Sequence, residues 1–193
     1  KYEEGLKKEN VEYFYSKKKE ELPTGTCLIL VTPDSERTMC TFLGTAGKIN
    51  ENDIDINAIN NSEIVFLEGY LWDEGNPKKA FDKAIAHSNK VAMSLSDLFC
   101  VERHKPYFLE LVRNKLDIIF SNEQEILSLI NSKSFDDAIS FSKEIKKNVV
   151  ITRGEKGAIS INGDEVVECE ANTNLKIKDL TGAGDLFAAG YLH

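Results

Sequence analysis

The 193-residue chain lacks closely spaced cysteines. Its four cysteines stand far apart, at positions 27, 40, 100 and 169, and no Cys-x-x-Cys pair occurs. This spacing gives neither the ligand pattern of a zinc site nor the framework of a disulfide-stapled domain. We therefore expect buried free thiols in a reducing compartment, which favours a cytoplasmic location.

Long apolar runs and an excess of basic residues are also absent. No stretch approaches the roughly 20 apolar residues that a membrane-spanning helix needs, and no signal peptide is evident. Lysine and arginine number 24 against 32 acidic residues, a formal charge of −8, which argues against a nucleic-acid-binding surface. With 41% hydrophobic and 29% charged residues, the composition predicts a soluble globular protein that handles small ligands.

No internal repeat, low-complexity tract or Pro/Ser-rich linker interrupts the sequence, so we expect one domain over residues 1–193. Apolar strand-like segments alternate with amphipathic helical segments from about residue 63 to 153, which predicts a mostly parallel sheet covered by helices on both faces. The expected strands are 63–67, 90–95, 116–120 and 148–152. One expected helix starts at the Asn76 cap. Ser96 or Asp97 can cap the segment after the 90–95 strand, and further helices are expected at 107–113, 123–130 and 134–145. Asn162-Gly163 then predicts an antiparallel hairpin after the last parallel strand.

The first 60 residues are less regular. Residues 26–32, TCLILVT, form a continuous apolar run, which predicts a strand buried on both faces. Residues 37–43 are expected to form its partner strand. We also expect a short strand at 11–15 and a short helix at 53–59.

Residues 179–185, DLTGAGD, join an extended segment to a helical run of small residues. The glycines let backbone N–H groups approach a ligand, and a helix amino terminus favours an anion. With Asp185 beside these donors, the stretch could hold a phosphate next to a carboxylate base, as phosphoryl transfer to an alcohol requires. The spacing alone is equally compatible with a plain glycine-rich helix start, in which the helix dipole favours Asp185 in the first turn.

The same stretch matches neither of two common nucleotide motifs. It is not a P-loop, because G-x-x-x-x-G-K-[S/T] occurs nowhere in the chain. It is not a dinucleotide fingerprint either, because Phe187 replaces the third small residue.

Polar motifs follow two of the predicted strands. Asn122 and Glu125 form either a helix-capping pair or a Mg²⁺–phosphate site that acts through water. Residues 152–157, TRGEKG, form either a tight turn or a glycine loop whose backbone approaches nucleotide phosphates, with Arg153 and Lys156 facing the phosphates or solvent. Because sites in open α/β sheets lie beyond the carboxyl ends of the strands, we expect these motifs and the 179–185 stretch at one edge. Arg37 either pairs with acidic neighbours or reaches a transferring phosphate.

Together the motifs resemble the ribokinase (PfkB) family of carbohydrate and nucleoside kinases. DLTGAGD resembles that family's C-terminal signature, D-x-T-G-A-G-D. Asn122-x-x-Glu125 resembles its N-x-x-E motif, and Thr152-x-Gly154-x-x-Gly157 its nucleotide loop. Segments 25–44 and 68–73 are most similar to the adenosine-kinase-like branch. The resemblance implies a Rossmann-like α/β/α sandwich with a small β lid, and ATP-dependent phosphoryl transfer to a hydroxymethyl group of a sugar or nucleoside.

The resemblance also implies roles for single residues around the transferred phosphate. Asp185 would be the base that takes the proton of the acceptor hydroxyl. Gly182, Ala183 and Gly184 would form an anion hole for the γ-phosphate. Asp179 matches a position near an activating monovalent cation, usually K⁺.

The remaining implied roles concern the metal, the nucleotide and the acceptor. Asn122 and Glu125 would organise Mg²⁺, with Glu125 acting through water. Three loop residues would face the ATP phosphates: Thr152, Gly154 and Gly157. Three residues of the 37–43 strand would lie near the acceptor: Arg37, Met39 and Thr41.

The family's N-terminal sugar-binding region and its C-terminal helices have no counterpart in this sequence. We therefore expect the chain to be the middle and catalytic portion of a longer kinase, impaired when isolated, and able to form a lid-to-lid homodimer only with further strands. Two other functions remain open. One is a non-catalytic nucleotide-binding or interaction domain of the same fold. The other is a dinucleotide-binding oxidoreductase, against which the missing third small residue speaks.

Overall fold

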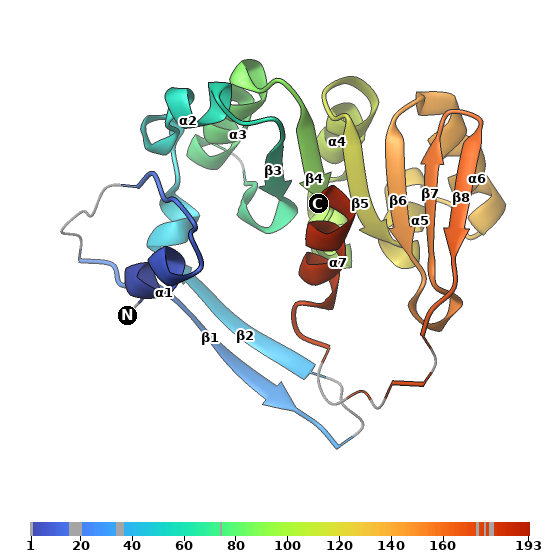
Figure 1. Ribbon diagram of the computed structural model, residues 1–193, viewed down its shortest axis with the longest axis horizontal. Coiled ribbons are helices and arrows are strands. Elements are labelled where there is room, and N and C mark those ends of the chain that lie inside the picture. The colour runs from blue at the N-terminus through green and yellow to red at the C-terminus, as the bar shows by residue number, and fades with distance from the viewer. Residues whose placement is uncertain are drawn as a thin grey trace.

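The computed structural model describes residues 2–15, 21–33, 37–73, 75–172, 174–175, 177 and 180–193. Its centre is a six-stranded sheet in the order β3-β4-β5-β6-β7-β8 (Figure 1). The first four strands run parallel, whereas β7 and β8 are antiparallel to their neighbours. The strands are β3 (Val65–Glu68), β4 (Val91–Ser94), β5 (Ile118–Asn122), β6 (Asn148–Thr152), β7 (Ala158–Asn162) and β8 (Glu165–Cys169). The predicted α/β class and the antiparallel hairpin are both confirmed.

Helices cover both faces of this sheet, as the alternation of strands and helices predicts (Figure 1). Four helices pack on one face: α3 (Asn76–His87), α4 (Leu98–Asn114), α5 (Glu123–Ile130) and α6 (Phe135–Ile145). They share that face because the three crossovers between neighbouring parallel strands, formed by α3, by α4 and by α5 with α6, have the same hand. The last helix, α7 (Ala183–Leu192), packs on the opposite face.

Alternate residues of the central strands bury into these two layers. Met93 and Ile119 belong to the core beneath α3–α6, whereas Ala92, Ile118 and Phe120 pack under Ala188 of α7. All five are at most 5% exposed. This double burial explains why the central strands are uniformly apolar rather than alternating in sequence.

The chain before the sheet forms a separate antiparallel hairpin of β1 (Thr24–Val31) and β2 (Arg37–Gly44) (Figure 1). The predicted strand pair is confirmed, but the predicted burial is wrong. Leu28, Leu30 and Val31 are each more than half exposed. A run of apolar residues sets the strand conformation, but burial requires a second layer, and no described residues cover the outer faces of this hairpin.

Three smaller expectations are corrected at the amino-terminal side. Residues 11–15 follow helix α1 (Tyr2–Lys8) without pairing, so the expected strand there is wrong. The short helix α2 (Ile56–Asn60) begins three residues later than expected and is capped by Asp55. Gly75, rather than Asn76, occupies the cap position of α3, because its φ of 89° suits glycine.

Two further differences concern α4 and the cysteines. Asp97 caps α4, as one of the two expected alternatives, but the helix is continuous from Leu98 rather than confined to 107–113, and it bends at His104, two residues before Pro106. Cys100 in this helix is buried, but the other three cysteines are exposed, so the expectation of four buried thiols is wrong.

We predict that the core beneath α4 dominates stability. Phe108 is fully buried, and Phe99 in the same helix is 66% exposed. Phe108→Ala should lower the free energy of unfolding by about 3–5 kcal/mol, because it leaves a cavity in a packed core. Phe99→Ala should change it by less than about 0.5 kcal/mol. Urea denaturation followed by circular dichroism measures both, and equal losses would contradict the assignment of the core.

Candidate active site

The carboxyl ends of the parallel strands form one edge of the sheet, where several motifs meet. In Figure 1 these strands point downward, and the amino end of α7 and the β6–β7 turn lie on the same lower side. Asn122 and Thr152 are directly paired in the β5–β6 register. Two motifs that are 30 residues apart in sequence are therefore neighbours, as expected from the topology.

Asn122 and Glu125 form a complete capping box at the start of α5. The Asn122 backbone N–H donates to Glu125 Oε2 at 3.0 Å, and Asn122 Nδ2 donates to Oε1 at 2.7 Å. In return, the Glu125 N–H donates to Asn122 Oδ1 at 2.8 Å. The capping interpretation is thus confirmed, and it is compatible with the predicted metal role, because the second lone pairs of the carboxylate oxygens remain free for a water molecule.

Glu125 is a buried carboxyl group whose pKa lies above the usual value for glutamate. It is 5% exposed, and burial raises the pKa of its carboxyl group to about 7, with the Asp97 charge adding to the rise and the Asn122 N–H opposing it. Because the pKa is near neutrality, a nearby cation would stabilise the ionised carboxylate. The residue therefore fits a site that holds Mg²⁺ through water.

Gly182 is the N-cap of α7 and has φ of 75°, in the left-handed region. Two backbone N–H groups near this end donate hydrogen bonds to backbone carbonyls. The Ala183 N–H donates to Leu180 O at 3.2 Å, and the Leu186 N–H donates to Gly182 O at 2.9 Å. Within the described part of the chain, the N–H groups of Gly184 and Asp185 have no backbone acceptor. These donors and the dipole of a ten-residue helix favour an anion at this end.

Asp185 lies in the first turn of α7 with its side chain exposed. Its Oδ2 would be 3.8 Å from a Cβ added to Gly182, so the carboxylate folds back over the helix start. The structure therefore brings the predicted base and the predicted anion donors together. Their chemical roles stay predictions.

Glu68, at the end of β3, is an additional acidic residue that motif spacing did not single out. Burial raises the pKa of its carboxyl group, the charge of Asp185 raises it further, and a hydrogen bond from Ser96 lowers it. Ser96 Oγ donates to Glu68 Oε2 at 3.4 Å. Glu68 could have been identified from the sequence by its position at the carboxyl end of a predicted strand, where sites in α/β sheets lie.

The β6–β7 turn has a geometry that requires glycine at one position. Gly157 has φ of 86°, and an added Cβ would lie 1.9 Å from the carbonyl oxygen of Cys169. Gly154 also has positive φ, 58°, but has open space around it. Thr152 Oγ1 donates to Ser121 O at 3.5 Å, which ties the start of the turn to β5.

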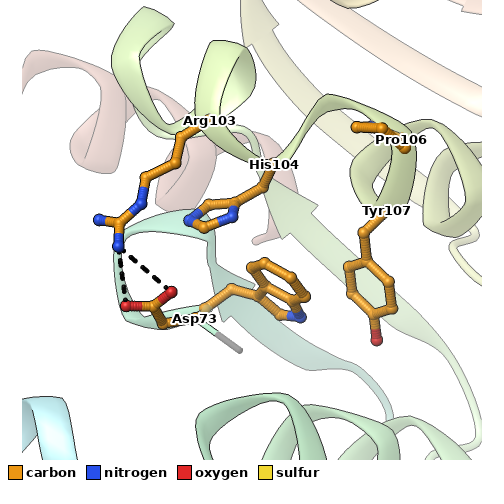
Figure 2. Close-up of a pocket in the computed structure, with 6 residues that line it drawn as sticks. Asp73, Arg103, His104, Pro106 and Tyr107 are labelled. Carbon is orange, nitrogen blue, oxygen red and sulfur yellow. Dashed lines mark hydrogen bonds and ion pairs between the residues drawn. The ribbon is translucent and has the colours of Figure 1, made fainter. Parts of the chain in front are cut away.

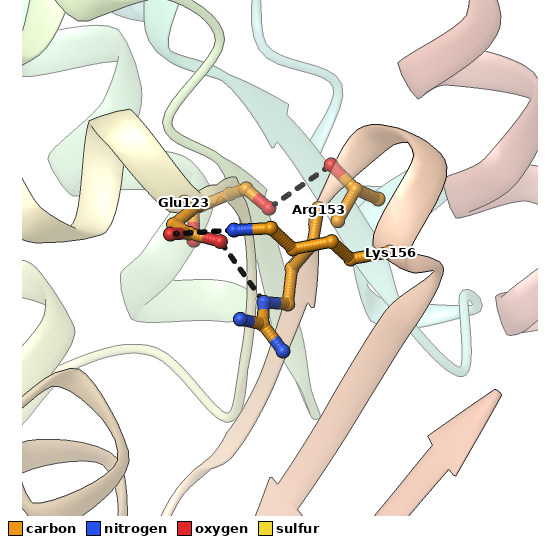
Figure 3. A network of polar contacts seen from close by, with 5 residues as sticks. Glu123, Arg153 and Lys156 are labelled. Carbon is orange, nitrogen blue, oxygen red and sulfur yellow. Dashed lines mark hydrogen bonds and ion pairs between the residues drawn. The ribbon is translucent and has the colours of Figure 1, made fainter. Parts of the chain in front are cut away.

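The two cations of this turn differ in exposure, since the Arg153 side chain is 20% exposed and that of Lys156 is 66% exposed. Figure 3 shows both of them approaching the Glu123 carboxylate. Arg153 Nε donates to Glu123 Oε2 at 2.9 Å, and Lys156 Nζ lies 3.7 Å from Oε1. The solvent alternative therefore describes Lys156, whereas Arg153 pairs with Glu123 instead.

The remaining predicted residues lie elsewhere. Arg37, Met39 and Thr41 belong to β2, in the hairpin that stands apart from the sheet in Figure 1. Arg37 Nε is buried and has no hydrogen-bond partner in the described ranges. Asp179 lies outside the described residues.

A hollow also lies away from the strand ends. It measures about 530 Å³ and lies beside α4, lined by Trp72, Asp73, Arg103, His104, Pro106 and Tyr107. Figure 2 shows Arg103 reaching Asp73, and their contact is 3.2 Å. None of the predicted site residues lines this hollow.

The described residues show neither a metal-ligand cluster nor a membrane-spanning helix. They contain no group of three or more His, Cys, Asp or Glu side chains arranged as metal ligands. No helix in the same part of the chain is both long and apolar enough to cross a membrane.

Comparison with known proteins places the chain in a family. The model of the pfkB family of carbohydrate kinases matches residues 1–193. A ribokinase from Dictyostelium discoideum is 26% identical, with 89% of this chain and 59% of that protein covered. The crystal structure of adenosine kinase from Sinorhizobium meliloti has a TM-score of 0.93 at 36% identity, with 99% of this chain and 60% of that chain covered.

A more distant structure has the same fold. A ribokinase II from E. coli, described as putative and solved in complex with ATP and Mg²⁺, has a TM-score of 0.74 at 20% identity over 86% of this chain.

The chain therefore belongs to the pfkB family of carbohydrate kinases, and its ribokinase-like fold is confirmed. It spans about 60% of the length of these relatives.

The raised pKa of Glu125 predicts a pH-dependent stability. Below about pH 7 the folded state holds this proton more tightly than the unfolded state, in which the group titrates near 4.5. Ionisation of Glu125 therefore costs stability as pH rises from about 4.5 to 7. The stability of Glu125→Gln relative to wild type should improve by about 1–3 kcal/mol between pH 5 and pH 8.

Urea unfolding in EDTA at several pH values measures this difference, with Glu110→Gln, an exposed glutamate of α4, as the control. A difference between Glu125→Gln and wild type that does not vary with pH would show that Glu125 is not the titrating group.

Proposed function

We propose that the intact protein transfers the γ-phosphoryl group of ATP to a hydroxymethyl group of a sugar or nucleoside. The observation that carries the proposal is the convergence at one sheet edge of the α7 amino terminus with Asp185, the Asn122–Glu125 pair and the β6–β7 turn. Family membership supports a carbohydrate or nucleoside kinase. One kinase domain over residues 1–193 is part of the same proposal.

Asp185 is proposed as the base. It would take the proton from the acceptor hydroxyl as the acceptor oxygen bonds to the γ-phosphorus, and the bond from that phosphorus to the β–γ bridging oxygen would break. The products are ADP and a phosphate ester. The exposed position of Asp185 beside N–H groups that have no backbone acceptor among the described residues supports this role, since the base must reach the acceptor hydroxyl next to the phosphate that those donors hold.

The phosphate oxygens would be held by the backbone around Gly182, Ala183 and Gly184. Among the described residues, the N–H groups of Gly184 and Asp185 have no backbone acceptor, whereas the N–H of Ala183 is bonded to Leu180, so the first two are the donors best placed for it. Donors fixed before the reaction stabilise developing negative charge without reorganisation.

Asn122 and Glu125 are proposed to hold Mg²⁺, with Glu125 acting through water. Mg²⁺, when bound, would neutralise charge on the phosphate oxygens. The raised pKa and fixed orientation of the Glu125 carboxyl fit this role. The nucleotide phosphates would lie against three residues of the neighbouring strand and turn: Thr152, Gly154 and Gly157.

The acceptor side is the least defined part of the proposal. Arg37, Met39 and Thr41 would approach the acceptor from β2, and Asp179 would lie near a K⁺ ion. A sugar or nucleoside acceptor is supported by the ribokinase and adenosine kinase relatives, and the adenosine kinase structure favours a nucleoside. A homodimer and a cytoplasmic location stay predictions.

We predict that Asp185→Asn in the full-length protein lowers kcat about 10²–10⁴-fold, the usual scale for a general base. The assay couples ADP release to a panel of adenosine, inosine, fructose, ribose and ketodeoxygluconate. Asp164→Asn, in the β7–β8 turn, is the matched control and should retain wild-type kcat.

Two results would count against the proposal. If Asp185→Asn retained most of its kcat, Asp185 would not be the base. If the wild type bound MgATP without turnover on any acceptor, the non-catalytic nucleotide-binding domain would be the better account.

A further inference from the structure

Glu123 is the first residue of α5 and directly follows Asn122. In Figure 3 its side chain lies between Arg153 and Lys156 of the β6–β7 turn. It therefore joins the segment proposed to hold Mg²⁺ to the segment proposed to face the nucleotide phosphates. The mechanism above gives it no role.

The Arg153 contact is the stronger of the two. Arg153 Nε donates to Glu123 Oε2 at 2.9 Å, and the two side chains are only 20% and 27% exposed. Lys156 is 66% exposed and lies at 3.7 Å, so solvent screens its attraction to Glu123. The Arg153 guanidinium also lies over the Phe135 ring at 3.7 Å, which fixes its orientation further.

Arg153 is also an anchor for the backbone of the turn. Its N–H donates to Gly157 O at 2.8 Å, and its carbonyl accepts from the Lys156 N–H at 3.1 Å. The turn closes with a bond from the Gly157 N–H to Gly154 O at 3.0 Å. Holding the Arg153 side chain therefore holds the position of residues 154–157.

We propose that Glu123 is a positioning residue that clamps the 152–157 turn against α5 through Arg153. Arg153 is then a structural cation and does not bind phosphate. The proposal rests on the proposed function, because it assigns the clamped turn to the nucleotide. The opposite possibility is that Glu123 repels phosphates by its charge, and that removing it would tighten ATP binding.

The first test is the kinetics of Glu123→Ala in the full-length protein. A turn that holds ATP equally in the ground and transition states should affect KM and leave kcat alone. We expect KM for ATP to rise roughly ten- to hundredfold, the range for a lost hydrogen bond to a charged group, with kcat changed less than about threefold. An unchanged or lowered KM would overturn the proposal.

The chain offers a matched control in Glu144→Ala. Glu144 Oε1 pairs with Arg113 Nη1 at 2.9 Å, and the Arg113 guanidinium lies over the Phe141 ring at 5.0 Å. A glutamate, an arginine and a phenylalanine thus meet here as they do at Glu123. This group lies where α4 and α6 end, on the side of the sheet away from the carboxyl ends of the parallel strands. KM for ATP should be unchanged in this variant, and a rise equal to that of Glu123→Ala would overturn the proposal.

A double mutant separates positioning from direct phosphate binding. If Arg153 acts only through the clamp, Glu123→Ala/Arg153→Ala should raise KM no more than the larger single effect. If Arg153 binds phosphate itself, the two effects should multiply, which would overturn its assignment as a structural cation.

Hydrogen exchange tests the clamp independently of activity. The amides of Lys156 and Gly157 should exchange faster in Glu123→Ala than in wild type, and at the wild-type rate in Glu144→Ala. Unchanged exchange in Glu123→Ala overturns the clamp even in an active enzyme. If the amides exchange faster in Glu123→Ala but the wild-type protein does not turn over ATP, the clamp is supported and the proposed kinase function is contradicted.

Discussion

The reciprocal hydrogen bonds between Asn122 and Glu125 link the end of β5 to the start of α5. They satisfy N–H groups at the helix start, hold a carboxylate in a buried position, and fix the point at which β5 stops. β6 pairs with β5 residue by residue up to Thr152, which lies opposite Asn122. The hydrogen bonds that fix the end of β5 therefore also fix the position at which the β6–β7 turn begins. The pKa of Glu125, the Glu123 contact and the position of the turn all depend on this junction.

A second constraint comes from the opposite face, where α7 packs on alternate residues of β4, β5 and β6. Ala188 belongs to the same buried cluster as Phe120 and Val150, so the amino end of α7 is held beside the carboxyl ends of the strands. The sheet therefore brings together an anion-favouring helix end, a carboxylate and a nucleotide-type turn. None of these features alone distinguishes a kinase site from ordinary helix capping, and their meeting at one edge carries the functional argument.

Where local patterns determine structure, the sequence alone was sufficient. The bounds of α5 and β6 follow from a capping pair and a short apolar run, and both agree with the structure. Burial of the 26–32 run was not predictable, because an apolar strand carries no information about which layer covers it. The cap at Gly75 was missed because Asn76 is the better side-chain cap, whereas the backbone there requires positive φ.

The candidate site shows the same division. Asn122, Glu125 and Asp185 were identified from spacing, but the Glu123–Arg153 ion pair joins residues 30 positions apart and depends on the β5–β6 register. Glu68 was missed for a similar reason, since its proximity to Asp185 exists only when β3 and α7 are placed. Contacts across the sheet edge require the fold, whereas the residues that make them are visible in the sequence.

The most direct test of the central claim is a hydrogen-exchange footprint of the full-length protein with Mg²⁺ and a non-hydrolysable ATP analogue. The account predicts that protection appears together in residues 122–125, 152–157 and 182–185, because all three border one phosphate site. Protection confined to the hollow around Trp72 and Tyr107, or absent from all three segments, would contradict it.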